Sequence, residues 1–375
     1  MKKKFMCLVL ALGVMMPSTS AFAENIYDND NFSFVEILSI SDDNGLETLS
    51  IDTAVEKALK NSTELKTVNL SLAVSEEQLE NSTESVDYNT GANSIQNILN
   101  LIKNQTSLKN SEEEKKVKEQ KIGLEMEQLF IEILNLQREI ALTTDTLDLE
   151  EKNLKITKAK LEMGLVSEQE YNESSLFLVK SKESLESKKQ NLNDLFKNLN
   201  ILIGEDDTSK KYNLDIDITY DILELETTPE VYATARVSES VSINNAKRNL
   251  EVSKKSYLVE QASDNATNIS IMQSENSVST AEMNIEDMIE NMETQVINLY
   301  NTIKTSETSI ENNKTELSNL KKNLEITKAQ YEMGKVSEME LKRAYNNVAS
   351  MENTIIKQIY EHNQNMKKFE NIDLM

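Results

Sequence analysis

Apolar residues recur at intervals of seven along two long stretches of the chain. The first row is Leu129, Ile133, Leu136, Ile140, Leu147, Leu154 and Leu161, and the second is Leu299, Ile303, Ile310, Leu317, Leu324 and Tyr331. This spacing is typical of amphipathic helices that pack against other helices. We predict one long helix from about Ile95 to Met163 and another that ends at Met333. The second row from Ile303 onward repeats the first at a distance of 170 residues, which indicates an internal duplication.

Nearly the same sequence spans the end of each long helix. KNLKITKAKLEMGLVSEQE, starting at Lys152, and KNLEITKAQYEMGKVSEME, starting at Lys322, agree at fourteen of nineteen positions. Gly164 and Gly334 are predicted C-caps, because glycine adopts the left-handed conformation without strain. Ser167 and Ser337 are predicted N-caps, each with a glutamate three residues later. We therefore expect two antiparallel helical hairpins with tight tips.

Shorter helices should flank each long one. The predicted spans are 50–81 with a break at Asn61–Ser62, 167–203, 229–262 and 337–372, joined by polar links 82–93 and 263–274 and an extended segment 212–220. Stacked end to end, two short helices match one long helix, so each repeat forms two columns. A second apolar line, Leu142, Leu149, Ile156 and Met163, gives the long helix neighbours on two sides. Four columns leave open edges, which copies of the chain would have to cover.

Composition indicates an exported protein. Lys2, Lys3 and Lys4 precede an apolar run, and Ala21-Phe22-Ala23 supplies a small-x-small cleavage pattern, so we predict a signal peptide over 1–23. Cleavage would remove Cys7, the single cysteine; a lipid anchor at Cys7 is the less favoured alternative. The net charge of −24 argues against nucleic-acid binding. An acidic leader is expected over 24–48.

Residues that carry chemistry are scarce. His362 is the only histidine, and we interpret it as a surface or packing residue. Met283, Met288 and Met292 lie at helical spacing, which favours packing over a copper site. No phosphate loop, Cys/His cluster or nucleophile elbow occurs in the sequence. We therefore predict no catalytic, cofactor-binding or metal-binding residues.

From about Leu49 to Ile372 the chain resembles the TolC-type outer-membrane efflux proteins. The resemblance rests on the start LSIDTAVEKALKNSTELK, on Tyr331-Glu-Met-Gly334 with Ala344 ten residues after the glycine, and on Leu199-Asn-Ile-Leu-Ile-Gly204. It implies an all-α chain of long antiparallel coiled-coil helices in two tandem repeats, 49–204 and 229–375, with a linker over 205–228. It also implies a homotrimeric α-barrel tunnel for export.

The resemblance assigns roles to the two tips. A membrane-fusion adaptor, which links such a tunnel to an ABC or RND-type inner-membrane pump, would contact Met163, Gly164, Val166, Ser167, Met333, Gly334, Val336 and Ser337. The family's gate uses acidic residues six and nine positions after the second tip glycine, where this chain has Glu340 and Arg343. With their counterparts Glu170 and Glu173, and with Tyr331, these residues form the candidate gate. A salt-bridged gate and a simple capping role for Glu340 remain open alternatives.

The chain departs from the family between the helices of each repeat. A membrane-spanning strand needs about 9–11 residues, so links of about a dozen residues cannot hold a strand pair. We therefore expect the transmembrane strands to be missing and the protein to lie in the cell wall or extracytoplasmic space, although the family resides in the outer membrane. The alternatives are a coiled-coil spacer or adhesin without a transport role and an adaptor. An enzyme is the least favoured class.

Overall fold

The computed structural model describes residues 45–88, 94–216 and 219–375. The predicted signal peptide 1–23, with Cys7, and residues 24–44 of the predicted leader 24–48 lie outside the described residues. The last residue of that leader, Thr48, begins a short strand. Residues 44–375 form a single compact unit.

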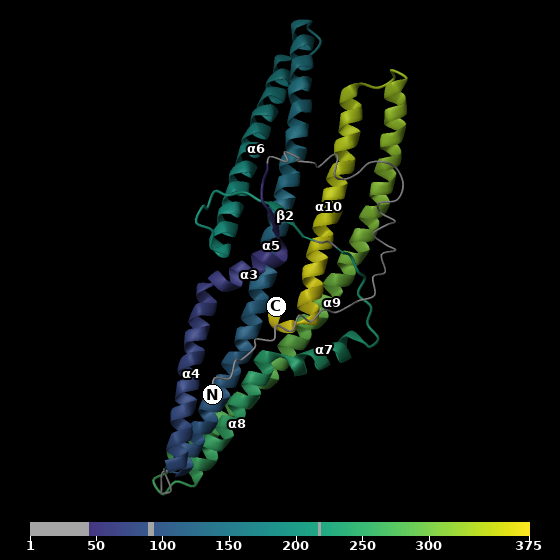
Figure 1. Ribbon diagram of the computed structural model, residues 1–375. Helices are drawn as coiled ribbons and strands as arrows, with labels where there is room; N and C mark the ends of the chain where they lie inside the picture. Colours follow the sequence, from purple (N-terminus) through teal and green to yellow (C-terminus); the bar gives the residue numbers. More distant parts are fainter. Residues whose placement is uncertain (1–44, 89–93, 217–218) are drawn as a thin grey trace. The chain divides into compact units, whose positions relative to one another are not determined.

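The described residues form two successive sets of helices in the same order (Figure 1). The first set is α3 (Ile51–Asn61), α4 (Thr63–Tyr88), α5 (Ser94–Glu162) and α6 (Glu168–Ile203). The second set is α7 (Pro229–Glu239), α8 (Val241–Gln261), α9 (Asn268–Glu332) and α10 (Glu338–Glu370), followed by the short 3-10 helix η1 (Ile372–Leu374). The predicted all-α class, the two long helices and the break at Asn61–Ser62 are confirmed.

Local capping explains where the short helices begin. The Ser50 side chain accepts a hydrogen bond from Thr53 N, and the Thr228 side chain accepts one from Val231 N beside Pro229 in the first turn. The predicted continuous helix over 229–262 was wrong, because the chain breaks at Ser240. The Ser240 hydroxyl caps α8 by accepting from Ile243 N at 3.3 Å. Its equivalent in the first set, Ser62, accepts from Leu65 N.

The polar links are shorter than predicted. Residues 82–88 continue α4, and residues 268–274 open α9 behind the N-cap Thr267, which forms a capping box with Ser270. Ser82 and Ser85 donate to the carbonyls of Gln78 and Asn81, so serines that indicate a loop in sequence are accommodated inside a helix. Residues 89–93 lie outside the described residues. The connection 262–267 contains no strand.

Two three-residue strands are the only ones in the described part of the chain. β1 (Thr48–Ser50) pairs in parallel with β2 (Asn213–Asp215), with Leu49 opposite Leu214. The predicted extended segment 212–220 therefore forms a strand over three residues, and 217–218 lie outside the described residues. The sequence contains no alternation that would have predicted β1.

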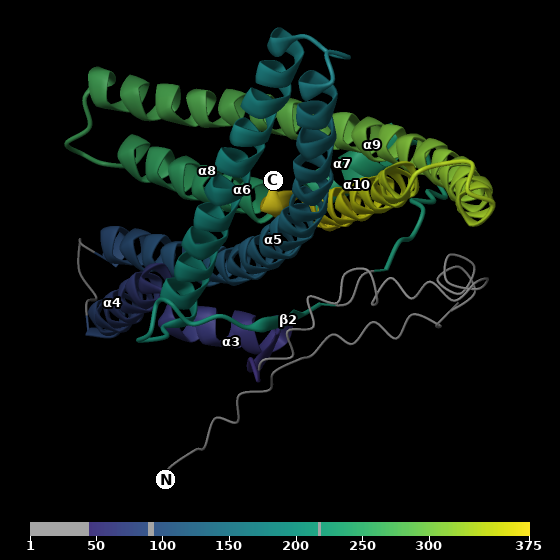
Figure 2. The same cartoon turned by 90° about the horizontal axis from the view of Figure 1, so that it is seen from above.

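The helices lie side by side as four columns. α4 and α6 pack on α5, α5 packs on α8 and α10, and these pack on α9. Figure 2 shows α5 with α6 and α9 with α10 as two hairpins. The two outer columns are therefore α4 with α6 on one side and α9 on the other. Apolar clusters centre on Phe130 and Ile133, on Val296 and Ile303, and on Ile310 and Leu317.

Candidate functional site

The two tips have the same backbone. Gly164 and Gly334 have φ of +71° and +69°, in the left-handed region that favours glycine. Leu165 N donates to Lys160 O and Lys335 N donates to Gln330 O, both at 2.8 Å. The glycine N–H of each tip bonds a carbonyl three residues earlier, which completes a Schellman turn. The predicted glycine C-caps are confirmed.

The two N-caps after the tips share the hydrogen bond made by the serine side chain, but only the second tip has the reciprocal bond from the glutamate. Ser167 and Ser337 accept from the N–H of Glu170 and Glu340 at 3.1 and 3.2 Å. In the second tip Glu340 Oε2 also accepts from Ser337 N at 2.7 Å, which completes the capping box. This backbone bond is the main reason why the pKa of the Glu340 carboxyl lies below its usual value; the Ser337 hydroxyl adds to it. A capping role therefore accounts for Glu340.

The candidate gate residues do not converge in one chain. Glu173 accepts from Gln169 Nε2 at 2.9 Å, and Glu340 faces its own cap. Among the residues that the structure describes, no ion pair joins Arg343 to Glu340 or to Glu173. Tyr331 is exposed on the second hairpin. A gating role for these residues, and a salt-bridged gate between chains, stay predictions.

The tips expose apolar side chains to solvent. Met163, Leu165 and Met333 are 65, 68 and 60% exposed, whereas Val166 and Val336 are half-buried. Lys335 takes the position that Leu165 has in the first tip. A Cβ atom added to Gly164 or Gly334 would meet nothing within 4 Å. Both tips are open to a partner, and the first is the more apolar.

The tips end at different heights along the columns. Lys342 pairs with Asp148 at 2.7 Å and Lys152 pairs with Glu338 at 3.4 Å, so the start of α10 lies level with residues 148–152 of α5. Because α10 and α5 are antiparallel, Gly334 lies near the height of residue 156. The first tip therefore extends beyond the second by about 12 Å, from roughly eight residues at 1.5 Å each (Figure 1).

The outer columns carry stripes of mostly uncharged residues on their exposed sides. The stripe on α9 is Asn301, Thr305, Thr308, Asn312, Thr315 and Asn319, and the stripe on α6 is Ser184, Ser187, Asn191, Asp194, Asn198 and Ile201. The alternating spacing of three and four places each set on one helix face. Asp194 is the single charged member. In a chain with 28% charged residues, such stripes are typical of a helix–helix interface without its partner.

Comparison with known proteins connects these features to a fold. No family model matches the chain, and no curated protein matches it in sequence. Among solved structures, CusC superposes with a TM-score of 0.64 at 12% identity, covering 86% of this chain and 91% of CusC. The outer membrane protein VceC from Vibrio cholerae gives 0.63 at 10% identity, covering 85 and 95%. The CmeC outer membrane channel from Campylobacter jejuni gives 0.56 at 13% identity, covering 86 and 85%. The chain has the TolC-type fold.

In this TolC-type fold the described residues hold no cluster suited to a metal ion. His362 is fully buried and its Nε2 lies 2.8 Å from Asp221 O, so it is a packing residue rather than a surface residue. Met288 and Met292 pack in a core cluster, whereas Met283 is exposed on α9 in the single chain, so its packing role stays a prediction. Within residues 45–88, 94–216 and 219–375, no helix combines the length and hydrophobicity needed to cross a bilayer.

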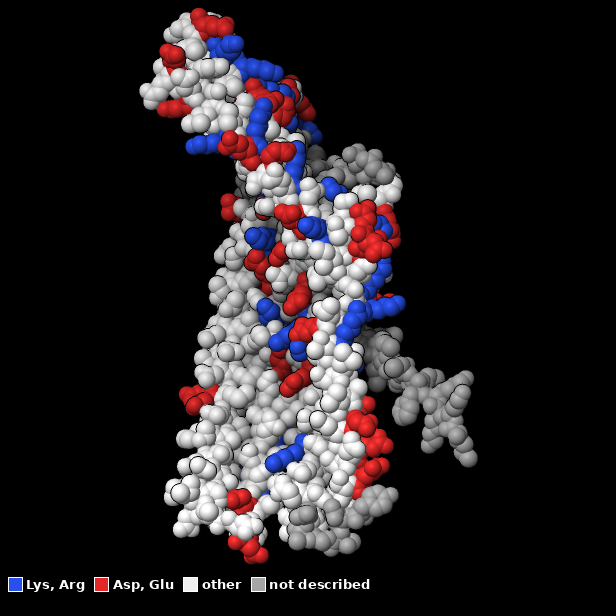
Figure 3. All heavy atoms as spheres, turned by 90° about the vertical axis from the view of Figure 1, so that its left-hand side faces the viewer, with Lys and Arg blue, Asp and Glu red and all other residues white. Residues whose placement is uncertain are grey.

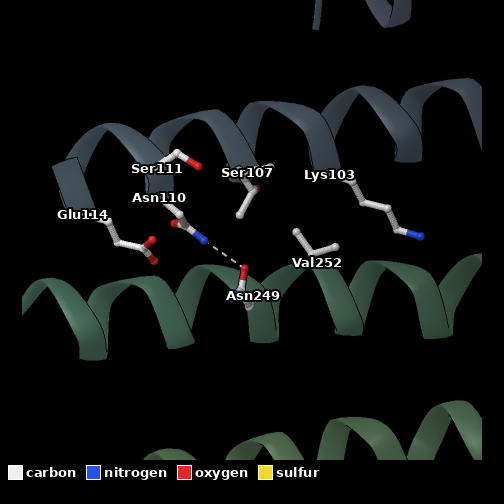
Figure 4. A pocket seen from close by; sticks show the side chains of 8 residues that line it. Lys103, Ser107, Asn110, Ser111, Glu114, Asn249 and Val252 are labelled. Carbon is white, nitrogen blue, oxygen red and sulfur yellow. Dashed lines mark hydrogen bonds between the residues drawn. The ribbon is translucent and has the colours of Figure 1, made fainter. Parts of the chain in front are cut away.

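A polar seam between the two repeats was missed in the sequence. A cleft of about 390 Å³ between α5 and α8 is lined mainly by hydroxyl and amide groups, with Lys103, Glu114 and Val252 beside them (Figure 4). Asn110 Nδ2 donates to Asn249 Oδ1 at 3.0 Å, and Arg248 Nε donates to Asn110 Oδ1 at 2.8 Å. Polar pairs inside a helix interface set its register. No periodic signal marks these residues, since their role depends on a partner more than 130 positions away.

Proposed function

We propose that this protein is the tunnel subunit of an export system and that three copies close into a ring. In the ring, the α4 and α6 column of one copy packs on α9 of the next. The TolC-type fold supports this proposal, because the solved CmeC and VceC proteins are described as an outer membrane channel and an outer membrane protein. The observation that carries it is the pair of mostly uncharged stripes on the two outer columns.

The heights of the two stripes agree. Lys188 of α6 pairs with Glu139 of α5 at 3.2 Å. The pairing of Lys342 with Asp148 places Glu139 level with residue 351 of α10, and Glu352 pairs with Lys321 of α9 at 2.9 Å. Residue 188 of α6 is therefore level with residue 321 of α9. Copies related by a rotation about the ring axis, with no shift along it, keep equal heights side by side. They would bring Asn191 of one chain against Asn319 of its neighbour.

The tips are the proposed contact with the rest of the export system. Six tips would surround one mouth of a trimer, at two heights. Met163 and Leu165 in the leading tip offer apolar surface, and Glu162, Glu168 and Glu170 outnumber the one base nearby in sequence, Lys160. This chemistry suits a helical hairpin of an adaptor that carries cationic and apolar residues. The adaptor would connect the tunnel to an ABC or RND-type pump in the inner membrane.

The proposed location is the extracytoplasmic side of the cell envelope. The signal peptide predicted over 1–23 and the outer-membrane location of the structural neighbours support an envelope protein. The cell wall zone is the finer proposal. A coiled-coil spacer remains the second candidate and would not form a closed ring.

Disulfide trapping tests ring closure. In a Cys7→Ser background, which has no other cysteine, the pair Asn191→Cys and Asn319→Cys should give covalent trimers under mild oxidation. Each single variant should stay monomeric on a denaturing gel, because the two positions lie on opposite outer columns. Sedimentation of the parent protein should give a trimer. A stable monomer at micromolar concentration together with no cross-linking would reject the tunnel.

A further inference from the structure

We infer that the contact between copies is uneven: the half near the tips closes tightly, and the far half is held apart by like charges until salt screens them. The tip half comprises α6 and residues 304–332 of α9. The far half comprises α4 and residues 268–303 of α9. This inference rests on the proposed function, since it takes the partner of both exposed edges to be a second copy of this chain.

The far half is rich in acids and has one base, Lys66 near the start of α4. Residues 67–102, which include most of α4, have five Asp or Glu and no Lys or Arg. Residues 256–303, which include the far half of α9, have eight Asp or Glu and no Lys or Arg. Both outer columns therefore carry a net negative charge in the far half.

The tip half is balanced. α6 has six acidic and five basic residues, and residues 304–332 of α9 have five of each. Figure 3 looks onto the side of α4 and α6: positive and negative groups intermix over its upper part, and the lower part shows scattered acidic groups and an occasional basic group on a largely uncharged surface. Charge repulsion between copies is thus confined to one half of the edge.

The acidic residues of the two far edges lie at the same height. Asn104 of α5 donates to Gln78 O of α4 at 3.1 Å, and Asn110 donates to Asn249 of α8. This register places Asn104 level with residue 255, and Lys254 pairs with Glu282 of α9 at 3.1 Å. Residue 78 of α4 is therefore level with residue 282 of α9. In a ring, Glu77 of one copy would lie within about one helical turn of Glu286 in the next.

The same faces also carry apolar residues, so the far half can close when repulsion is weakened. The exposed stripe on α4 is Thr67, Leu70, Val74, Glu77, Asn81 and Glu84, and the stripe on α9 is Ile269, Met272, Asn276, Ser279, Met283, Glu286 and Glu290. Leu70 is 70% exposed and Val74 is 57% exposed. Among the described residues, no ion pair neutralises Glu77, Glu286, Asp287 or Glu290.

Ionic strength should control the contact between the far halves of adjacent copies. The Debye length falls from about 10 Å at 0.1 M salt to about 3 Å at 1 M. At low salt the carboxylates of adjacent copies repel across the interface. At high salt that repulsion is screened while the apolar contacts persist. The mouth opposite the tips should therefore narrow as ionic strength rises, and the tip half should not respond.

Two cysteine pairs separate the halves. In the Cys7→Ser background, Asn81→Cys with Ser279→Cys reports on the far half, and Asn191→Cys with Asn319→Cys is the matched control in the tip half. We expect the far-half yield of disulfide-linked trimers to rise about fivefold between about 0.05 and 1 M NaCl, with the tip-half yield constant within about twofold. The triple variant Glu286→Gln, Asp287→Asn, Glu290→Gln should reach the high-salt yield at low salt. The control variant Glu311→Gln, Glu316→Gln, Glu325→Gln should leave the far-half yield unchanged.

The outcomes distinguish the two levels of the proposal. Failure of the tip-half pair at every salt concentration, together with a stable monomer in sedimentation, rejects the tunnel itself. A trimer without the tip-half cross-link overturns the contact between α6 and α9 on which this inference depends. A tip-half cross-link with a far-half yield that is independent of salt and of the triple variant overturns this inference alone. A far-half pair that never cross-links, beside a tip-half pair that does, also overturns it, because the two far edges then do not meet.

Discussion

The two joints where short helices stack into a column use opposite chemistry. In the first repeat, Asn61 Nδ2 donates to Ile201 O at 3.0 Å and to Leu202 O at 3.3 Å, at the C-terminal end of α6. In the second repeat, the Asp373 carboxylate accepts from Val241 N at 2.8 Å and Ser242 N at 3.2 Å, at the N-terminal end of α8. A donor meets free carbonyls in one joint and an anion meets free N–H groups in the other, as the helix dipole favours.

At the joint, the two repeats therefore share the backbone arrangement but not the side chains that stabilise it. Both breaks keep a capping serine, Ser62 or Ser240. A helix has unpaired N–H groups at its N-terminus and unpaired carbonyls at its C-terminus. A side chain at the joint can therefore stabilise it by bonding to either helix end. The tips depend on a single local turn, and the two copies of the tip sequence agree at fourteen of nineteen positions.

Loss of the carboxylate should have the largest effect on the joints. Asp373→Ala removes the acceptor for two backbone N–H groups and for the Ser240 hydroxyl at 2.8 Å. We expect the free energy of unfolding to fall by about 3 kcal/mol, since bonds to charged groups contribute about 1.5–3 kcal/mol. Urea denaturation followed by circular dichroism measures it. Asp373→Asn should recover part of the loss, and equal losses in both variants would contradict a role for charge.

Substitution of Gly204 tests the first joint. Gly204 has φ of +72°, and an added Cβ would lie 2.8 Å from Asn61 Cγ. Gly204→Ala should therefore lower the free energy of unfolding by about 2 kcal/mol through strain and crowding. Gly164→Ala is the matched control, because φ is +71° and the surrounding space is open. It should cost about 1 kcal/mol, and the same loss at both positions would show that contact with Asn61 contributes nothing.

Truncation of Asn61 should have a smaller effect than loss of Asp373. Asn61→Ala removes two neutral bonds to the end of α6, so we expect a loss of about 1 kcal/mol. Hydrogen exchange should show the change in the last turn of α6 and not at the start of α8. If exchange rises at α8, the two joints are coupled and the comparison between them fails.

The smallest expected effect is the pH dependence of the second tip. The pKa of Glu340 is below its ordinary value of 4.5 in the folded chain. The contribution of the ionised Glu340 carboxylate to folding stability is therefore fully present at pH values above that ordinary pKa. It is lost as the pH falls through the lower pKa of the folded chain. Glu340→Gln should reduce stability slightly at pH 7 and flatten its dependence on pH below about 4.5. Glu170→Gln is the matched variant and should change this dependence less, because only Glu340 closes a capping box.

The candidate site was predictable where it depends on neighbours in sequence. The tip glycines and capping serines follow from local rules, and the structure places them as predicted. The break at Ser240 was missed because the helical pattern continues through it, and a partner of Ser240, Asp373, lies 133 residues away. The unequal heights of the tips were missed for the same reason, since they depend on pairs such as Lys342 with Asp148.

Most of the helices, their duplication, the turns at the tips and the acidic stretches of the far half can be predicted from the sequence, because each depends on residues close together in the chain. Which columns are outermost, which faces stay exposed and which heights agree follow only from the folded chain. These depend on contacts between segments more than a hundred residues apart, such as Asn110 with Asn249. Periodicity predicts that a helix has an apolar face, but packing decides which neighbour covers it.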